Sequence, residues 1–204
     1  VPRPWVVSGE HGFSIIENDE DKGDLLPIGR MKAFHGQMGM FIRTYAYLLS
    51  HGGDGLFQAS GDAVLNANYI MAELCDYLSP SYDGPCMHEC LFDDRFLEGT
   101  GLTTLDFSKA MIDEGYHPMT MYFPLIVHGA MLIEPTETES KKSLDDFITV
   151  MRQLAIDAKS GQNNRFIGAP EFTPRRRLDE TKAARQPILR WKEQGEDRNK
   201  ARQK

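Results

Sequence analysis

The sequence predicts a small α/β domain in which helices pack on one face of a short sheet. Three observations favour this class. Apolar residues recur at three- and four-residue intervals in four segments, which indicates four helices. Short apolar runs bounded by Gly, Pro or Asp, typical of strands, alternate with the last two of these segments. No internal repeat is present. With 41% hydrophobic and 26% charged residues, the 204-residue chain has the composition of an ordinary globular domain.

The first elements are strands followed by two helices. Apolar runs at residues 5–7 and 13–16 predict a β-hairpin or two edge strands. A helix is predicted over 37–50, stopped by His51-Gly52-Gly53, and a longer one over 56–78, ended by Pro80. The two apolar stripes are Met38, Phe41, Ile42, Tyr45, Leu48 and Leu49, and then Val64, Ala67, Met71, Leu74, Cys75 and Leu78.

Three strands and two helices follow. The strands are predicted at 86–92, 119–123 and 127–133. Thr103 or Thr104 is expected to cap a helix that runs to residue 114 and stops at Gly115. Its predicted face is Leu105, Ser108 and Ile112, and the stripe of the last helix, over 139–158, is Leu144, Phe147, Ile148, Met151, Leu154 and Ala155.

The helical periodicity fades after Gly161, where the charge also changes sign. Residues 175–204 contain eleven Lys or Arg against five Asp or Glu, whereas the whole chain has a net charge of −7. We therefore divide the chain into N-terminal strands and linker at 1–29, an α/β domain at 30–160 and an irregular basic tail at 161–204. The tail lacks interleaved aromatic residues, so no nucleic-acid partner is predicted.

The sequence contains neither a signal-peptide pattern nor an apolar run near the ~20 residues that cross a bilayer. We therefore expect a cytoplasmic protein without a membrane partner. Three cysteines cannot all pair within one chain, and a cytosolic protein keeps them reduced. On a strand, Cys86, His88 and Cys90 would share one side, but structural zinc needs a fourth ligand, so a packed strand without metal is predicted.

Two other segments attract attention. In the run RMKAFHGQMG at 30–39, glycine near a helix start allows close approach of a ligand, although the residues by themselves favour a structural turn over a ligand loop. In EPTETES at 134–140, Thr136 with Glu139 predicts a capping box for the last helix. Capping leaves Glu134 unexplained, because a carboxylate at the end of an apolar strand needs a partner or solvent.

A set of ordered segments resembles a known family. They are GRMKAFHGQMG, AVLNANYI, YDGPCMHE, LDFSKAMIDEGYHPMTMYFPLIV, MLIEPTETES and TPRRRLDETKAAR, and they cover nearly the whole chain. They resemble the C-terminal part of glycine decarboxylase, the P-protein of the glycine cleavage system, in particular the second subunit of its split bacterial form. The resemblance implies the small C-terminal domain of a fold type I pyridoxal-phosphate enzyme.

The resemblance implies a reaction and partners. Such an enzyme decarboxylates glycine and transfers the aminomethyl group to the lipoylated H-protein, so the implied partners are glycine, H-protein and the rest of the P-protein or its other subunit, in an oligomer. The family's Schiff-base lysine lies in a histidine- and glycine-rich segment that this sequence does not contain. The chain is therefore expected to be inactive alone and not to hold pyridoxal phosphate covalently. The alternative is a non-catalytic interaction or regulatory module derived from that domain.

In fold type I enzymes the small domain closes over the cofactor with its entry segment and its strand ends. The resemblance thereby assigns the pocket to His35, Gly36, Glu134 and Thr136, with no catalytic residue and no metal ligand in this chain. One departure from the family is Ala169-Pro170-Glu171, where a carboxylate replaces the usual histidine or aromatic residue and reverses the local charge.

Overall fold

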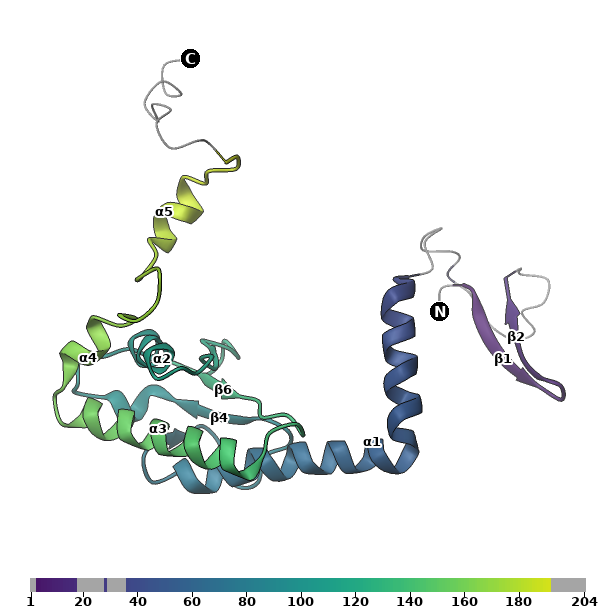
Figure 1. Ribbon diagram of the computed structural model, residues 1–204, viewed down its shortest axis with the longest axis horizontal. Helices are drawn as coiled ribbons and strands as arrows, with labels where there is room; N and C mark the ends of the chain where they lie inside the picture. The colour runs from purple at the N-terminus through teal and green to yellow at the C-terminus, as the bar shows by residue number, and fades with distance from the viewer. Residues whose placement is uncertain (1–2, 18–27, 29–35, 192–204) are drawn as a thin grey trace, which may run out of the picture. The chain divides into compact units, whose positions relative to one another are not determined.

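The computed structural model describes residues 3–17, 28 and 36–191, and it divides into two compact units, Val1–Leu56 and Phe57–Lys204 (Figure 1). The first unit contains the hairpin of β1 (Trp5–Gly9) and β2 (Gly12–Ile16), which pair antiparallel from Trp5 opposite Ile16 to Gly9 opposite Gly12. Gly12 has φ +109°, a value that favours glycine in the tight turn. The predicted hairpin is confirmed.

Helix α1 (Met38–Leu74) is interrupted at Gly52, whose φ of 63° and ψ of −174° are not helical. The predicted break at His51-Gly52-Gly53 is therefore confirmed, while the second helical stretch ends four residues earlier than predicted. This early end explains one error in the expected stripe. Cys75 lies just beyond the helix and is exposed, whereas Ile70, outside the predicted stripe, is buried.

The second unit is built on a four-stranded antiparallel sheet in the order β3-β4-β6-β5. Its strands are β3 (Ser79–Pro80), β4 (Cys90–Asp93), β5 (Thr120–Met121) and β6 (Met131–Ile133). In the central pair, Cys90 lies opposite Ile133 and Phe92 opposite Met131.

The predicted strands were too long. The strand predicted at 86–92 begins only at Cys90. The Cys86 N–H donates to Asn68 Oδ1 and the Cys86 carbonyl accepts from Asn68 Nδ2, so neither group pairs with a neighbouring strand. Residues 122–130 form the loop between β5 and β6, although 122–123 and 127–130 were predicted to lie in strands. Apolar composition alone therefore overestimated the paired length.

Helices α2 (Thr104–Asp113) and α3 (Lys141–Lys159) pack on this sheet together with the second half of α1 (Figure 1). Thr103 caps α2 in a reciprocal capping box with Asp106, and Gly115 follows its end with φ +85°. The face predicted for α2 was displaced: Ser108 is buried as expected, but Leu105 and Ile112 are half-buried and the core side is Phe107, Ala110 and Met111. The stripe predicted for α3 is confirmed, with Phe147 only partly buried.

The core reaches into the segment after Gly161. The 3-10 helix η2 (Asp94–Leu97) places Phe96 edge-on to Phe107 at 5.3 Å, and the short helix α4 (Asn163–Ile167) stacks Phe166 on the same ring at 6.2 Å. Further on lies α5 (Glu180–Arg185), which buries no residue. Within the described part of the chain, no helix is both long and apolar enough to cross a bilayer.

Candidate functional site

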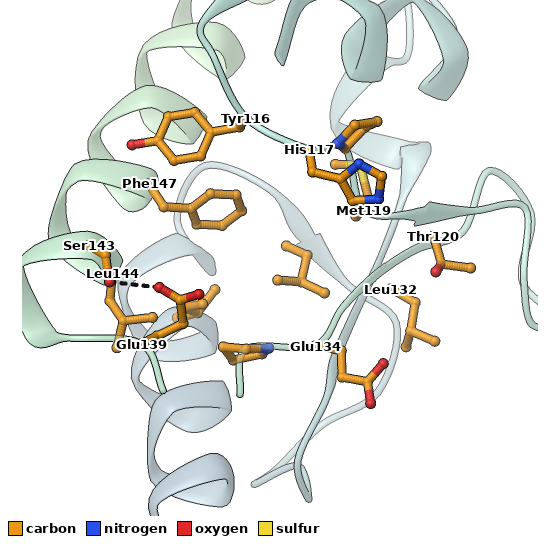
Figure 2. Close-up of a pocket in the computed structure, with 14 residues that line it drawn as sticks. Tyr116, His117, Met119, Thr120, Leu132, Glu134, Glu139, Ser143, Leu144 and Phe147 are labelled. Atoms are coloured by element: carbon orange, nitrogen blue, oxygen red, sulfur yellow. Dashed lines mark hydrogen bonds between the residues drawn. The ribbon is translucent and has the colours of Figure 1, made fainter. Parts of the chain in front are cut away.

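The second unit contains a cavity of about 500 Å³ where three segments meet (Figure 2). These segments are the loop that enters β5, the residues that follow β6 and the first turns of α3. The floor is apolar, with Ile70 of α1 and Leu144 of α3 among its residues. Its polar groups are Tyr116, His117, Thr120, Glu134, Glu139 and Ser143.

On the α3 side of the cavity, the lining side chains contact one another. Ser143 Oγ donates a hydrogen bond of 2.7 Å to Glu139 Oε2, the dashed line in Figure 2. The ring of Tyr116 meets that of Phe147 edge-on at 5.5 Å. Partial burial raises the pKa of Tyr116, the Asp146 carboxylate raises it further and the Lys142 ammonium acts in the opposite direction, so the phenol stays protonated at neutral pH.

The opposite side of the cavity is formed by Glu134, the first residue after β6. Ile133 is buried in the sheet, whereas the Glu134 side chain is 61% exposed, so water solvates the carboxylate that the sequence left unexplained. Its Oε1 lies 3.8 Å from His88 Nε2, which also lies 4.0 Å from Glu89 Oε2.

The side chains of His88, Glu89 and Glu134 bring three potential ligand atoms within 4.8 Å of one another. All three are substantially exposed, and such groups commonly gather on protein surfaces without a metal, so we interpret them as a surface charge cluster. The predicted alignment of Cys86, His88 and Cys90 on one strand face does not occur, because only Cys90 belongs to β4. Burial raises the pKa of both the Cys86 and the Cys90 thiols, which keeps them protonated.

Two asparagines of α1 form hydrogen bonds to the segments that contain His88 and Glu134. The Asn68 amide donates to the Cys86 carbonyl at 2.7 Å and accepts from the Cys86 N–H at 3.0 Å, which fixes the loop leading to His88. Two residues earlier, Asn66 Nδ2 donates to the Thr136 carbonyl at 3.0 Å, which fixes the segment that follows Glu134. The LNANY run thus positions both loops from one helix.

Of the three described residues that the sequence assigned to the pocket, one lines this cavity. Glu134 is a lining residue, while Gly36 belongs to the first unit, with φ +106°, and His35 lies outside the described residues. Thr136 is exposed and does not line the cavity; its Oγ1 pairs with Thr138 Oγ1 at 2.7 Å.

The capping role predicted for Thr136 is wrong. Ser140 is the N-cap of α3, because its Oγ accepts from the Ser143 N–H at 3.1 Å, and the helix begins at Lys141. Glu139 reaches the Ser143 hydroxyl instead of the N-terminus of a box begun at Thr136. Both Thr136 and Ser140 fit the local composition of a cap, and the observed helix start decides between them.

Sequence reasoning missed His117 and Ser143 as lining residues. His117 stands in the HPMTMYFP run, which the family resemblance had singled out, but no pattern placed it near α3. Ser143 lies on the first turn of α3, next to the predicted stripe residue Leu144. Both residues line one cavity although they lie 26 positions apart in sequence, and no local pattern predicts such an arrangement.

The charge of the cavity limits what it can bind. Among the described residues, its lining contains two carboxylates, one imidazole and three hydroxyls, but neither Lys nor Arg. A phosphate group would lie near Glu134 and Glu139 without a compensating cation, which is unfavourable in a partly desolvated site. These residues therefore do not fit the phosphate of pyridoxal phosphate, and they offer no amine to its aldehyde.

Comparison with known proteins adds family information. The family described as "Glycine dehydrogenase, C-terminal domain" matches residues 59–168. The chain is 66% identical over 192 residues to a protein of Caulobacter vibrioides named "Probable glycine dehydrogenase (decarboxylating) subunit 2", covering 94% of this chain and 37% of the relative. Proteins of the same name from Treponema denticola and Kosmotoga olearia are 44% and 46% identical, again over 94% of this chain but over 39% and 38% of their own length.

Proposed function

Because this chain belongs to the glycine dehydrogenase C-terminal domain family, we propose that it works as the C-terminal domain of a glycine-decarboxylating enzyme. In the complete protein, the cavity beside Glu134 forms one wall of the site that receives glycine. The main support is that the family match, residues 59–168, includes every residue that lines the cavity.

The cofactor of the complete enzyme is, in this proposal, pyridoxal phosphate held by residues outside this chain. The support is electrostatic: the cavity supplies carboxylates where a phosphate needs cations, and no described lysine lines it. The chain spans less than two-fifths of the length of the relatives it matches, which leaves room elsewhere for the lysine that binds the cofactor.

The proposed partners follow from the same placement. The relatives are named as a subunit 2, so we propose that the complete protein assembles with a second kind of subunit and passes the aminomethyl group to the lipoylated H-protein. Oligomerisation is part of this proposal.

Within this chain, Glu134 is the residue that we propose to act in the glycine site. It lies at the edge of the cavity with a solvated carboxylate, and among the described residues only His88 is within ion-pair distance of it. A carboxylate so placed can accept a hydrogen bond from a cationic or N–H-bearing ligand entering the cavity. His35, Gly36 and Thr136 remain predicted pocket residues of the complete enzyme.

The test uses the complete enzyme assembled with its partner subunit. We expect Glu134→Gln to lower glycine-dependent exchange of CO₂ at least tenfold, because the neutral amide accepts a weaker hydrogen bond. The matched control is Glu89→Gln, which removes the other carboxylate near His88 but does not line the cavity, so its exchange rate should stay within twofold of wild type. Thermal unfolding of both variants should match wild type.

Equal exchange rates for Glu134→Gln, Glu89→Gln and wild type would remove Glu134 from the site. An assembled wild-type protein without glycine-dependent CO₂ exchange would contradict the proposed function itself and would favour a non-catalytic interaction module.

A further inference from the structure

The loop between β5 and β6 exposes an apolar tip in the second unit. Leu125 and Ile126 are 86% and 85% exposed, and Tyr122 and Phe123 beside them are 46% and 56% exposed. These residues are consecutive except for Pro124, so they form one contiguous patch rather than scattered apolar side chains. Soluble proteins rarely leave such patches open unless something binds them.

The inner base of the loop is firmly held. The Tyr122 N–H donates to the Ala130 carbonyl at 2.8 Å, which closes the loop. The Tyr122 hydroxyl accepts from the Leu105 N–H at 3.2 Å, at the start of α2. The buried Thr104 hydroxyl donates to the Gly129 carbonyl at 2.7 Å.

A second brace lies at the end of the loop. His128 Nδ1 lies 2.9 Å from Asp94 Oδ1 at the start of η2. Gly129, with φ +58°, permits this approach, because a side chain there would collide with the Asp94 carboxylate. Hydrogen bonds thus connect the base of the loop to α2, to η2 and across the loop itself. The apolar tip is therefore pre-organised, and little conformational entropy would be lost if the tip became buried.

We propose that the tip, Tyr122–Phe123–Leu125–Ile126, docks into an apolar recess on the part of the family's polypeptide that lies outside this chain. This inference rests on the proposed function, which makes the chain one domain of a longer protein. The relatives are more than twice as long as the stretch that they share with this chain, so most of their surface lies outside it.

The size of the patch favours an occupant on the same polypeptide. Four side chains with these exposures can bury roughly 500 Å² on their own side of an interface. Specific complexes between separate proteins bury about 800 Å² on each partner, so the tip alone is too small to hold a separate subunit or a second copy. A domain on the same chain needs less area, because covalent linkage raises its effective concentration to about the millimolar range.

The test compares hydroxyl-radical labelling of the four tip side chains in the 204-residue chain and in the complete polypeptide that contains it, without the second kind of subunit. We expect labelling of Leu125 and Ile126 to fall at least fivefold in the complete polypeptide. This readout does not depend on catalysis, so it can fail or succeed independently of CO₂ exchange.

A variant provides the second arm. The double substitution Leu125→Ser with Ile126→Ser in the complete polypeptide should restore labelling of Phe123 toward the level of the 204-residue chain. The matched control is Ile156→Ser, an exposed apolar position that belongs to α3 and not to the loop, which should leave the labelling of Phe123 low.

Three results would overturn the proposal. One is equal labelling of the tip in the 204-residue chain and in the complete polypeptide. Another is protection that arises only when the second kind of subunit is added. The third is protection in the 204-residue chain that grows with its concentration, which would mean that a second copy covers the tip.

Discussion

At the scale of single residues, hydroxyl and carboxylate side chains at the helix starts fix where α2 and α3 begin. The Ser140 side chain accepts a hydrogen bond from a backbone N–H in the first turn of α3, and the Thr103 side chain does the same at the start of α2, where Asp106 completes the capping box. Both arrangements satisfy backbone N–H groups that have no partner inside the helix. Asp106 has a further role, since its other carboxylate oxygen accepts from Arg177 Nη1 at 2.7 Å.

The cap of α3 gives the first prediction. Ser140→Ala removes the acceptor of the Ser143 N–H and should lower the free energy of unfolding by about 1 kcal/mol. Thr136→Ala is the matched control, because the Thr136 side chain is exposed and, among the described residues, its hydroxyl pairs with that of Thr138; this variant should cost less than about 0.5 kcal/mol. Urea unfolding followed by circular dichroism measures both, and a larger loss for Thr136→Ala would restore that residue as the cap.

The second prediction concerns pH and Asp106. Burial raises the pKa of Asp106, but hydrogen bonds from Thr103 and Arg177 together outweigh burial, so the pKa in the folded state lies below its usual range. The resulting stabilisation is fully present above the unfolded pKa of about 3.9 and is lost as the pH falls through the lower folded value. Asp106→Asn should therefore be less stable at pH 7 but lose less stability than wild type between about pH 5 and pH 3.

Urea unfolding at several pH values between 3 and 7 checks this expectation. Arg177→Gln should change the profile in the same direction, because it removes one of the donors that lower the pKa. A wild-type slope for Asp106→Asn would show that this carboxyl does not contribute to acid destabilisation.

At the scale of elements, the short helix α4 belongs to the core although it follows the regular part of the sequence. Phe166 is fully buried against Phe107. Arg177 fastens the segment by donating to the carbonyls of Ala169 and Phe166 at 2.8 and 2.7 Å. The residues after Gly161 are therefore structured at least as far as this arginine.

The third prediction compares two phenylalanines six positions apart. Phe166→Ala should destabilise the domain by about 3–5 kcal/mol, since it leaves a cavity beside Phe107. Phe172→Ala, at a side chain that is 83% exposed, should change stability by less than about 0.5 kcal/mol. Chemical denaturation provides the measurement, and similar losses for both variants would place α4 outside the core.

At the scale of the whole molecule, two surfaces of the second unit are candidates for contact with other polypeptide. The cavity beside Glu134 has no cation in its described lining, and the apolar tip of the β5–β6 loop is exposed on a braced support. The relatives are much longer than this chain. Both of our proposals assign the completion of these surfaces to other parts of the family's protein.

The fourth prediction follows for the 204-residue chain alone. It should show no glycine-dependent CO₂ exchange when supplied with pyridoxal phosphate. Borohydride reduction should not fix the cofactor stoichiometrically on any one lysine, because no described lysine lines the cavity. Peptide mapping after reduction provides the measurement, and a single lysine modified in proportion to protein would show that the chain holds the cofactor covalently.

The sequence by itself determined the order of the longer helices and of the main strands in this protein. The hairpin, the break at Gly52, a cap at Thr103 or Thr104 and the buried stripe of α3 were all predicted, because each depends on interactions within a few residues. Glu134 was also identified from the sequence alone, as a carboxylate that local capping could not explain. Local periodicity and capping are therefore sufficient for these features.

Only the tertiary structure decided the strand lengths and the composition of the cavity. The hydrogen bonds between Asn68 and Cys86 replaced strand pairing before β4, and the segment of His117 lines the same cavity as Glu139 and Ser143 at the start of α3. Phe166 packs against Phe107, which in turn contacts Phe96, and these two residues lie about 60 and 70 positions earlier in the sequence. Such contacts depend on how the chain folds back on itself, and a local pattern contains no information about which distant residue will arrive.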